Sequence, residues 1–297
     1  MSSNSKKCSL CPRSCNIDRT VSKGYCGVSC GDNSLIAAKA MLHYGEEPVI
    51  SGENGSGAVF FSGCNMGCVF CQNYPVSRGE LGREITADRL SEIFLELQAQ
   101  GANNINLVTA THFIPQIVKA LEAARPRLSV PVIFNCGGYE SVDSLKMLEG
   151  LVDVYLPDIK YYDDRLALRY SNVKGYFDTA LCALKEMLRQ TGRYRIIDGL
   201  IKRGVIVRHL ILPGCYKDSM EIFRRLAPFG KDILISLMRQ YCPMGRASDY
   251  PEINRRLTTF EYKKVLELCT DLGFEGFTQD KASATDEMTP DFDFSGL

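Results

Sequence analysis

Short apolar runs alternate with amphipathic stretches along most of this 297-residue chain. We expect the apolar runs to form strands at 58–62, 105–109, 132–135, 152–156, 205–212 and 233–238. The other stretches have the spacing of helices with one apolar face, at 86–100, 115–124, 141–148, 177–189, 218–227 and 258–272. Six strand–helix units in series predict an α/β fold with a parallel sheet and right-handed crossovers.

Three closely spaced cysteines follow the first predicted strand. Cys64, Cys68 and Cys71 have the spacing C-x3-C-x2-C. Three thiolates hold three irons of a [4Fe–4S] cluster and leave the fourth iron open to a small molecule. The alternative is a structural zinc ion, but zinc normally takes four ligands in paired C-x2-C spacing, and the sequence has no fourth cysteine near this loop. We therefore favour the cluster.

A second group of cysteines lies within the first thirty residues. Four of them have the spacing for one tetrahedral metal site, namely Cys8, Cys11, Cys15 and Cys26, and Cys30 is left over. Thiolate-only sites suit zinc and an auxiliary iron–sulfur cluster alike, so both metals stay open. Because the segment is too short to bury a core, we expect its metal to hold it together. We predict a small Cys-rich metal-binding extension at 1–50 and a main domain at 51–297.

Composition and charge exclude several classes of function. Lys plus Arg and Asp plus Glu each number 35, so the zero net charge gives no reason to expect binding to nucleic acid or to an anionic membrane. No apolar run reaches the roughly 20 residues needed to cross a bilayer, and the first seven residues lack the apolar core of a signal peptide. With 13 cysteines, we expect a cytoplasmic metal-binding protein rather than a disulfide framework.

Polar residues cluster where the predicted strands end. The carboxyl ends of parallel strands meet at one end of the fold, and buried strands seldom finish in charge without a partner for it. We therefore select as site candidates Thr109, Thr111, His112, Asn135, Gly137, Gly138, Asp158, Lys160 and Arg208. Cys136, Cys215 and Cys242 also follow strands, and a redox or catalytic role for one of them stays open.

The cysteine loop resembles a known signature. Phe70 precedes Cys71, and the pattern C-x3-C-x-aromatic-C resembles that of the radical S-adenosylmethionine (SAM) superfamily. The resemblance implies a partial (β/α)6 barrel of the TIM type, open on one side, and the count of six strands is independently consistent with it. It further implies that the open iron binds SAM and that SAM is cleaved reductively to methionine and a 5′-deoxyadenosyl radical. An external electron donor such as flavodoxin or ferredoxin is then required.

Within that superfamily the chain resembles the activating enzymes of glycyl-radical enzymes. Asp158-Ile159-Lys160 is similar to a D-x-K motif of pyruvate formate-lyase activating enzyme, whose lysine contacts SAM and whose aspartate lies close to the cofactor and to the glycine-bearing peptide. Residues 208–214 resemble the fifth-strand segment of that enzyme. Shorter motifs spread over nearly the whole chain resemble its PflX-like branch, at 8–13, 24–27, 42–48, 71–74, 155–158 and 250–252.

The resemblance implies an oxidoreductase that uses this radical to take hydrogen, with a glycine of a glycyl-radical enzyme as the first candidate target. The PflX-like branch carries the activase name by similarity, and what it acts on is not implied by the match. Two alternatives remain, a radical SAM enzyme that modifies another peptide or a small metabolite, and a non-catalytic iron–sulfur electron carrier. The carrier gives no reason for an open iron within a full barrel.

The resemblance also assigns roles to the strand-end residues. Asp158, Lys160 and Arg208 are expected to hold the SAM carboxylate, the ribose hydroxyls or a substrate amide. The glycines at 137 and 138 should let the backbone approach the adenosine.

The second strand departs from the pattern of many relatives. Where these have Gly-Gly-Glu to hold the SAM ammonium, this chain has Thr109-Ala110-Thr111-His112, whose hydroxyls and carbonyls can still accept hydrogen bonds. His112 either orients SAM or substrate or is structural. His43 and His209 are interpreted as structural.

Overall fold

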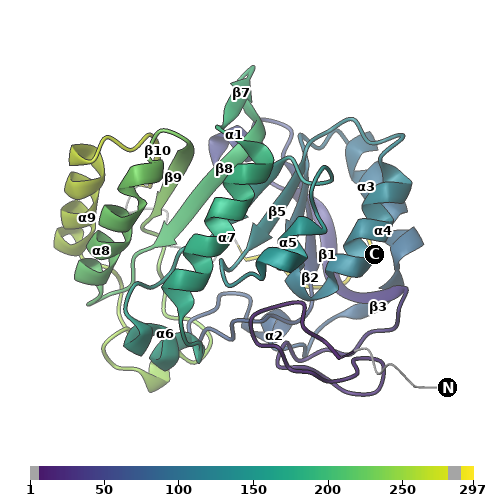
Figure 1. The fold of residues 1–297 in the computed structure, drawn as a ribbon, viewed down its shortest axis with the longest axis horizontal. Helices are drawn as coiled ribbons and strands as arrows, with labels where there is room; N and C mark the ends of the chain where they lie inside the picture. The colour runs from purple at the N-terminus through teal and green to yellow at the C-terminus, as the bar shows by residue number, and fades with distance from the viewer. Residues whose placement is uncertain (1–6, 280–288) are drawn as a thin grey trace.

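The structure, a computed structural model, describes residues 7–279 and 289–297. Residues 1–6 of the predicted extension and 280–288 of the predicted main domain therefore lie outside the described residues. The strands are β1 (Ser34–His43), β2 (Ser56–Phe61), β3 (Arg83–Thr86), β4 (Ile105–Val108), β5 (Val132–Cys136), β6 (Val154–Pro157), β7 (Arg195–Ile197), β8 (Leu200–Leu210), β9 (Ile233–Met238) and β10 (Gly276–Thr278). Within the described residues they form one sheet in the order β10-β9-β8-β6-β5-β4-β2-β1-β3, with β7 paired to β8 (Figure 1).

The centre of the sheet consists of the six strands that the sequence predicts. Neighbouring strands here pair in parallel, in the order β2-β4-β5-β6-β8-β9. Every residue of β2, β5, β6 and β9 is buried. Strands covered on both faces have continuous apolar sequences, which is why this part of the fold could be predicted. The predicted α/β class with a parallel sheet is confirmed.

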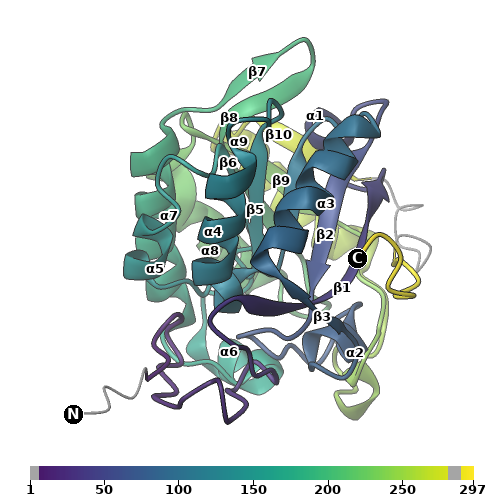
Figure 2. The same ribbon diagram turned by 90° about the vertical axis from the view of Figure 1, so that its right-hand side faces the viewer.

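The longer helices and α5 cover the outer face of the curved sheet (Figures 1 and 2). These are α3 (Ala87–Ala99), α4 (Ile114–Ala124), α5 (Val142–Lys146), α7 (Tyr176–Thr191), α8 (Tyr216–Leu226) and α9 (Thr259–Asp271). The short helices α1 (Pro48–Ser51), α2 (Tyr74–Ser77) and α6 (Asp164–Ser171) lie toward the ends of the strands. The six helices of the outer face correspond to the predicted helices, and α9 begins at a capping box of Thr258 and Glu261. The short helices α1, α2 and α6 were not predicted, and two of them lie near the carboxyl ends of the strands.

Four strands were not predicted. β1 pairs antiparallel with β2 and β3, β10 adds a parallel strand beside β9, and β7 forms a hairpin with β8. The hairpin turns at Asp198-Gly199, where both residues have positive φ, as a two-residue turn requires. Because of this hairpin β8 begins at Leu200, earlier than expected. β1 precedes residue 50 and belongs to the main sheet, and the predicted boundary at residue 50 stays a prediction.

The N-terminal segment before β1 lies across the end of the fold where the parallel strands finish, beside α2 and α6 (Figures 1 and 2). The backbone N–H of Cys64 donates to the carbonyl of Cys26. Arg13 donates to the carbonyls of Asn65 and Met66, at 2.9 and 3.0 Å. The segment is therefore attached to the loop that carries Cys64, Cys68 and Cys71. Across the described ranges 7–279 and 289–297, the helices are all too short or too polar to span a bilayer.

Candidate active site

The three cysteines of the loop after β2 meet at one cavity. Cys68 is buried, while Cys64 and Cys71 are partly exposed, and all three line a cavity of about 200 Å³ at the carboxyl ends of the strands. Burial and then the neighbouring Cys68 raise the pKa of Cys64 to about 12, and the same two causes raise the pKa of Cys71. Thiols in such a setting ionise only with a cation present, and a bound metal ion provides that charge.

The environment of these sulfur atoms fits a [4Fe–4S] cluster. The Met66 N–H donates to Cys64 Sγ at 3.4 Å, and the Ser171 hydroxyl donates to Cys68 Sγ at 2.9 Å. Such hydrogen bonds are one of the means by which a protein sets the potential of a cluster. Among the residues that the structure describes, no three His, Cys, Asp or Glu side chains are grouped to hold a single metal ion. A cubane does not require such a group, because each of its cysteines binds a different iron.

A charged network from β6 and β8 forms another wall of the same cavity. Lys160 Nζ lies 2.5 Å from Asp158 Oδ2, and Arg208 Nε lies 3.0 Å from Asp158 Oδ1. Burial alone would raise the pKa of Asp158, but Lys160 and Arg208 outweigh it, so this pKa lies below its usual value. Burial opposes the charge on Lys160, whereas Asp158 favours it and raises its pKa to about 12. All three groups are therefore ionised at neutral pH.

Arg208 also binds two residues that were not predicted to contact it. Its Nη1 lies 3.0 Å from Glu46 Oε2, and its Nη2 donates to Asn135 Oδ1 at 2.8 Å. Glu46 comes from the loop between β1 and α1, and its Oε1 accepts from the Asn106 amide at 2.9 Å. Glu46 was missed as a site residue because it follows β1, a strand that was not predicted. The predicted contact of Arg208 with SAM or substrate stays a prediction, since each of its three nitrogens already donates one hydrogen bond.

The two glycines after β5 have different environments. Gly137 lines the cavity together with Phe70 and Asn135, but Gly138 does not. Gly138 has φ +80°, and a Cβ placed there would lie 2.2 Å from the carbonyl oxygen of Asp158. Its lack of a side chain thus serves the close approach of the turn after β5 to the end of β6, and contact with adenosine stays a prediction for both glycines.

Tyr176 at the start of α7 fixes this junction. Its hydroxyl lies 2.8 Å from the carbonyl of Gly137 and 2.9 Å from that of Asp158, and it accepts from the Lys160 N–H at 3.0 Å. The side chain is fully buried. Tyr176 therefore positions the backbone on both sides of Asp158. It gave no sequence signal, because an aromatic residue at a helix start usually contributes only to the core.

The segment after β4 is divided between the cavity and the interior. Thr109 lines the cavity with φ +62°, a conformation that is strained for a β-branched residue. Thr111 and His112 are buried and do not line it. His112 Nε2 donates to the carbonyl of Ser62 at 2.7 Å, and burial and Arg19 lower its pKa to about 3, so the ring is neutral. These contacts are those of a structural histidine, and a role in SAM binding stays a prediction for both residues.

Of the two histidines interpreted as structural, His209 has the contacts of that role, whereas His43 has them only in part. His209 is buried, and its Nδ1 donates to the carbonyl of Ile159 at 2.6 Å, as in a structural role. His43 packs edge-on against Phe60 but also lines a second cavity.

The five N-terminal cysteines are gathered in one region. Burial is the largest cause that raises the pKa of Cys11, Cys26 and Cys30. Negative charge on Cys8 and Cys15 raises the pKa of Cys11 and Cys26 further, and negative charge on Cys26 and Cys8 raises that of Cys30. The four cysteines of the predicted second site therefore lie near one another, with Cys30 beside them.

A buried cation lies next to these thiols. Arg19 is buried and donates one hydrogen bond to the carbonyl of His112. Its Nε and Nη2 have no hydrogen-bond partner within residues 7–279 and 289–297. The guanidinium lowers the pKa of Cys26 and Cys30, against the effect of burial. A buried cation without a carboxylate partner is suited to neighbours that become thiolates on binding a metal ion.

Comparisons with known proteins agree with this geometry. The sequence model of the radical SAM superfamily matches residues 58–227. The uncharacterized protein MJ0674 of Methanocaldococcus jannaschii is 31% identical over 273 residues, which cover 89% of this chain and 74% of that protein. The chain belongs to the radical SAM superfamily. Membership implies an enzyme with a [4Fe–4S] cluster and SAM, so the alternative of a non-catalytic electron carrier is set aside.

Solved structures resemble the fold. Methylornithine synthase (PylB) matches with a TM-score of 0.50 at 15% identity, over 72% of this chain and 68% of that one. A radical SAM methyltransferase from Sphaerobacter thermophilus matches with a TM-score of 0.51 at 15% identity, over 75% of this chain and 66% of that one. At such low identity the likeness concerns the fold alone.

The tight contact at Gly138 gives a first prediction. Gly138→Ala should lower the free energy of unfolding, because the new Cβ displaces the Asp158 carbonyl. Gly150→Ala is the matched control, since Gly150 also has φ +80° but no atom within 4 Å of the added Cβ. Gly150→Ala should lower the free energy of unfolding by about 1–2 kcal/mol, because alanine is strained in the left-handed conformation. Gly138→Ala should lower it by at least about 1 kcal/mol more, because the added Cβ also meets the Asp158 carbonyl. Urea unfolding measures both, and equal losses would contradict the close packing at Gly138.

Proposed function

We propose that this radical SAM enzyme binds its cluster and SAM in the cavity of about 200 Å³ and uses them to take hydrogen from a C–H bond of a second molecule. The observation that supports this most directly is that Cys64, Cys68 and Cys71 line the same cavity as Asp158, Lys160 and Arg208. The cysteine loop, proposed to hold the cluster, and the charged network, proposed to hold a polar cofactor, therefore line one small cavity.

The chain's own residues have separable tasks in this proposal. Cys64, Cys68 and Cys71 hold three irons. Together with SAM, the reduced cluster supplies a 5′-deoxyadenosyl radical that can take hydrogen from an unactivated carbon. Lys160 donates one of its three N–H groups to Asp158, which leaves two donors for the carboxylate or ribose of SAM. Asp158 is held in place by Lys160 and Arg208, so it can accept from a hydroxyl or an amide without moving.

Apolar side chains complete the cavity and limit the entry of water. Met66, Phe70, Leu210, Met238 and Tyr241 line it opposite or beside the charged network. Exclusion of water strengthens electrostatic contacts and protects a reactive carbon radical from side reactions. This division into a charged wall and an apolar wall is suited to a cofactor with a charged end and a reactive carbon.

The substrate that we propose first is a glycine of a glycyl-radical enzyme. The similarity of Asp158-Ile159-Lys160 and of residues 208–214 to an activating enzyme, and the motifs of the PflX-like branch, support this choice. Flavodoxin or ferredoxin is the proposed electron donor, and the cytoplasm is the proposed location. The second candidate is modification of another peptide or a small metabolite.

We also propose that Cys8, Cys11, Cys15 and Cys26 bind zinc or an auxiliary iron–sulfur cluster. The charge interactions among these thiols and the buried guanidinium of Arg19 support a site whose ligands are anionic. Within the described residues no three of the thiols are grouped around one point, so binding of a single zinc ion would require their side chains to move together. Since the segment contacts the cluster loop, its metal would help to hold that loop in place.

SAM cleavage should depend on the loop cysteines. Anaerobically reconstituted protein, reduced with dithionite in the presence of SAM, should form 5′-deoxyadenosine, detected by mass spectrometry. Cys64→Ala should lower its formation at least about 100-fold, because one iron loses its ligand. Cys182→Ala, at an exposed position on α7, should leave the rate unchanged. Formation of S-adenosylhomocysteine alone would instead identify a methyltransferase and contradict the proposal.

The N-terminal site should retain metal without the first cluster. A variant with Cys64, Cys68 and Cys71 all changed to Ala should keep about one zinc or about four irons per chain when purified without oxygen. Adding Cys11→Ser should remove that metal, whereas adding Cys182→Ser should not. Metal analysis and sulfide assay distinguish the two alternatives, and a triple variant free of both metals would contradict the second site.

A further inference from the structure

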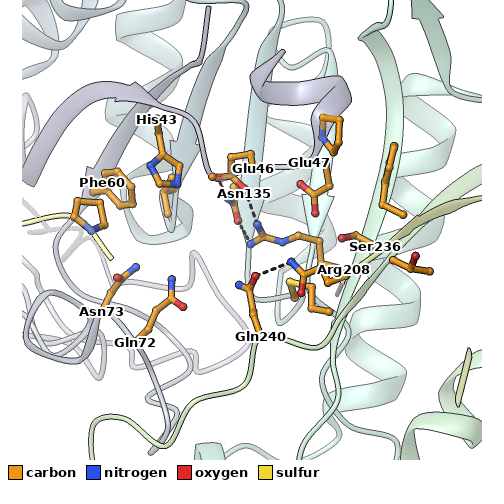
Figure 3. A pocket seen from close by; sticks show the side chains of 18 residues that line it. His43, Glu46, Glu47, Phe60, Gln72, Asn73, Asn135, Arg208, Ser236 and Gln240 are labelled. Atoms are coloured by element: carbon orange, nitrogen blue, oxygen red, sulfur yellow. Dashed lines mark hydrogen bonds and ion pairs between the residues drawn. The ribbon is translucent and has the colours of Figure 1, made fainter. Parts of the chain in front are cut away.

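A second cavity, of about 170 Å³, adjoins the cavity of the cysteines (Figure 3). It lies between β1 and β10, and its wall includes His43, Ser236 and the loop that carries Glu46 and Glu47. The two cavities share lining residues, among them Asn73, Val108, Asn135, Arg208 and Gln240. A molecule in the second cavity would therefore extend toward the first.

Glu47 is the feature of this cavity that the fold does not explain. Its side chain comes from the residue before α1, and only 8% of the residue is exposed. Figure 3 shows the carboxylate directed into the cavity. In the part of the chain that the structure describes, nothing donates a hydrogen bond to Oε2. A buried carboxylate oxygen without a partner is costly, and a purely structural role would favour an apolar residue here.

The cations near Glu47 are already engaged. Arg208 forms ion pairs with Glu46 and Asp158, and its Nη2 donates a third hydrogen bond, to Asn135. His43 is neutral, because burial and then Arg208 lower its pKa.

Glu46 and Glu47 line the cavity with Arg208, which also pairs with Asp158, and Lys160 binds Asp158 as well. When Glu47 is ionised, the three carboxylates carry one negative charge more than the two cations. Burial raises the pKa of Glu47 against the effect of Arg208, so a bound cation would stabilise its ionised form.

We propose that the second cavity is the substrate subsite of the same enzyme and that Glu47 binds a cationic N–H group of the substrate, an ammonium or a guanidinium. A charge-assisted hydrogen bond to Oε2 supplies the missing partner. The side-chain amides of Gln72, Asn73 and Gln240 line the path toward the cysteines and can bind polar atoms of the rest of the molecule. This assignment rests on the proposed function only in calling the bound molecule a substrate.

Binding of three molecules of equal length tests the charge preference. Ligand-observed NMR titrations of the full-length, cluster-containing protein compare n-butylammonium, n-butanol and butyrate. The expected result is that n-butylammonium binds at least about ten times more tightly than n-butanol, and that butyrate does not bind. Equal binding of n-butylammonium and n-butanol to the unchanged protein would overturn the proposal, and this comparison depends on no variant.

A conservative variant tests the residue. Glu47→Gln should weaken n-butylammonium binding at least about tenfold and leave n-butanol binding unchanged. Glu53→Gln removes an exposed carboxylate shortly after α1 and should change neither affinity. An unchanged n-butylammonium affinity in a folded Glu47→Gln protein would assign the cation to another group and overturn the role of Glu47.

A further ligand distinguishes two sources of the cationic group. Lysine blocked at both backbone ends resembles a lysine within a peptide, whereas n-butylammonium resembles a small amine. Binding of both supports a peptide substrate, and binding of n-butylammonium alone supports a small metabolite. None of these titrations requires SAM cleavage, so failure of the subsite and failure of the proposed radical chemistry would be seen in separate experiments.

Discussion

The ion pairs of Arg208 connect most of the parts that matter in this protein. One guanidinium binds Asp158 from the end of β6, Glu46 from the loop after β1, and Asn135 from β5. Charges in the interior lose hydration, and such a network is stable only when each member has partners. Removal of Arg208 would leave Glu46 without its ion-pair partner and Asp158 with Lys160 alone, at a cost of about 3–5 kcal/mol. The network therefore fixes the β1–α1 loop and the strand ends relative to one another.

The same network lines both cavities. Arg208 and Asn135 line both of them, with the three cysteines on one side and Glu47 on the other. Because Asp158 is bound by both Lys160 and Arg208, the charged wall of the first cavity is set before any molecule binds. This arrangement allows a cofactor and a second molecule to occupy neighbouring positions without rearrangement of the strands, which is what hydrogen transfer between them requires.

Much of this could be predicted, for identifiable reasons. Four of the six central strands, β2, β5, β6 and β9, are buried throughout and have largely apolar sequences, and the cysteine spacing is specific. β1 was missed because Lys39 interrupts its apolar residues and three of them are alanine, which is a poor strand former. β10 was missed because it has only three residues. Contact of Gly138 with adenosine stays a prediction, and the approach of the Asp158 carbonyl is a requirement for glycine there that the sequence did not indicate. Glu46, Glu47 and Tyr176 act through contacts across the fold, which local sequence patterns do not encode.

The account depends on a cluster with one iron free to bind SAM, held by Cys64, Cys68 and Cys71. Electron paramagnetic resonance of the reduced, reconstituted protein tests this directly. The cysteine variant Cys11→Ser serves as the background, so that any second cluster does not contribute. We expect the signal of a reduced [4Fe–4S] cluster whose g-values change when SAM is added. A cluster signal that SAM leaves unchanged would contradict the account, because all irons would then be closed to the cofactor.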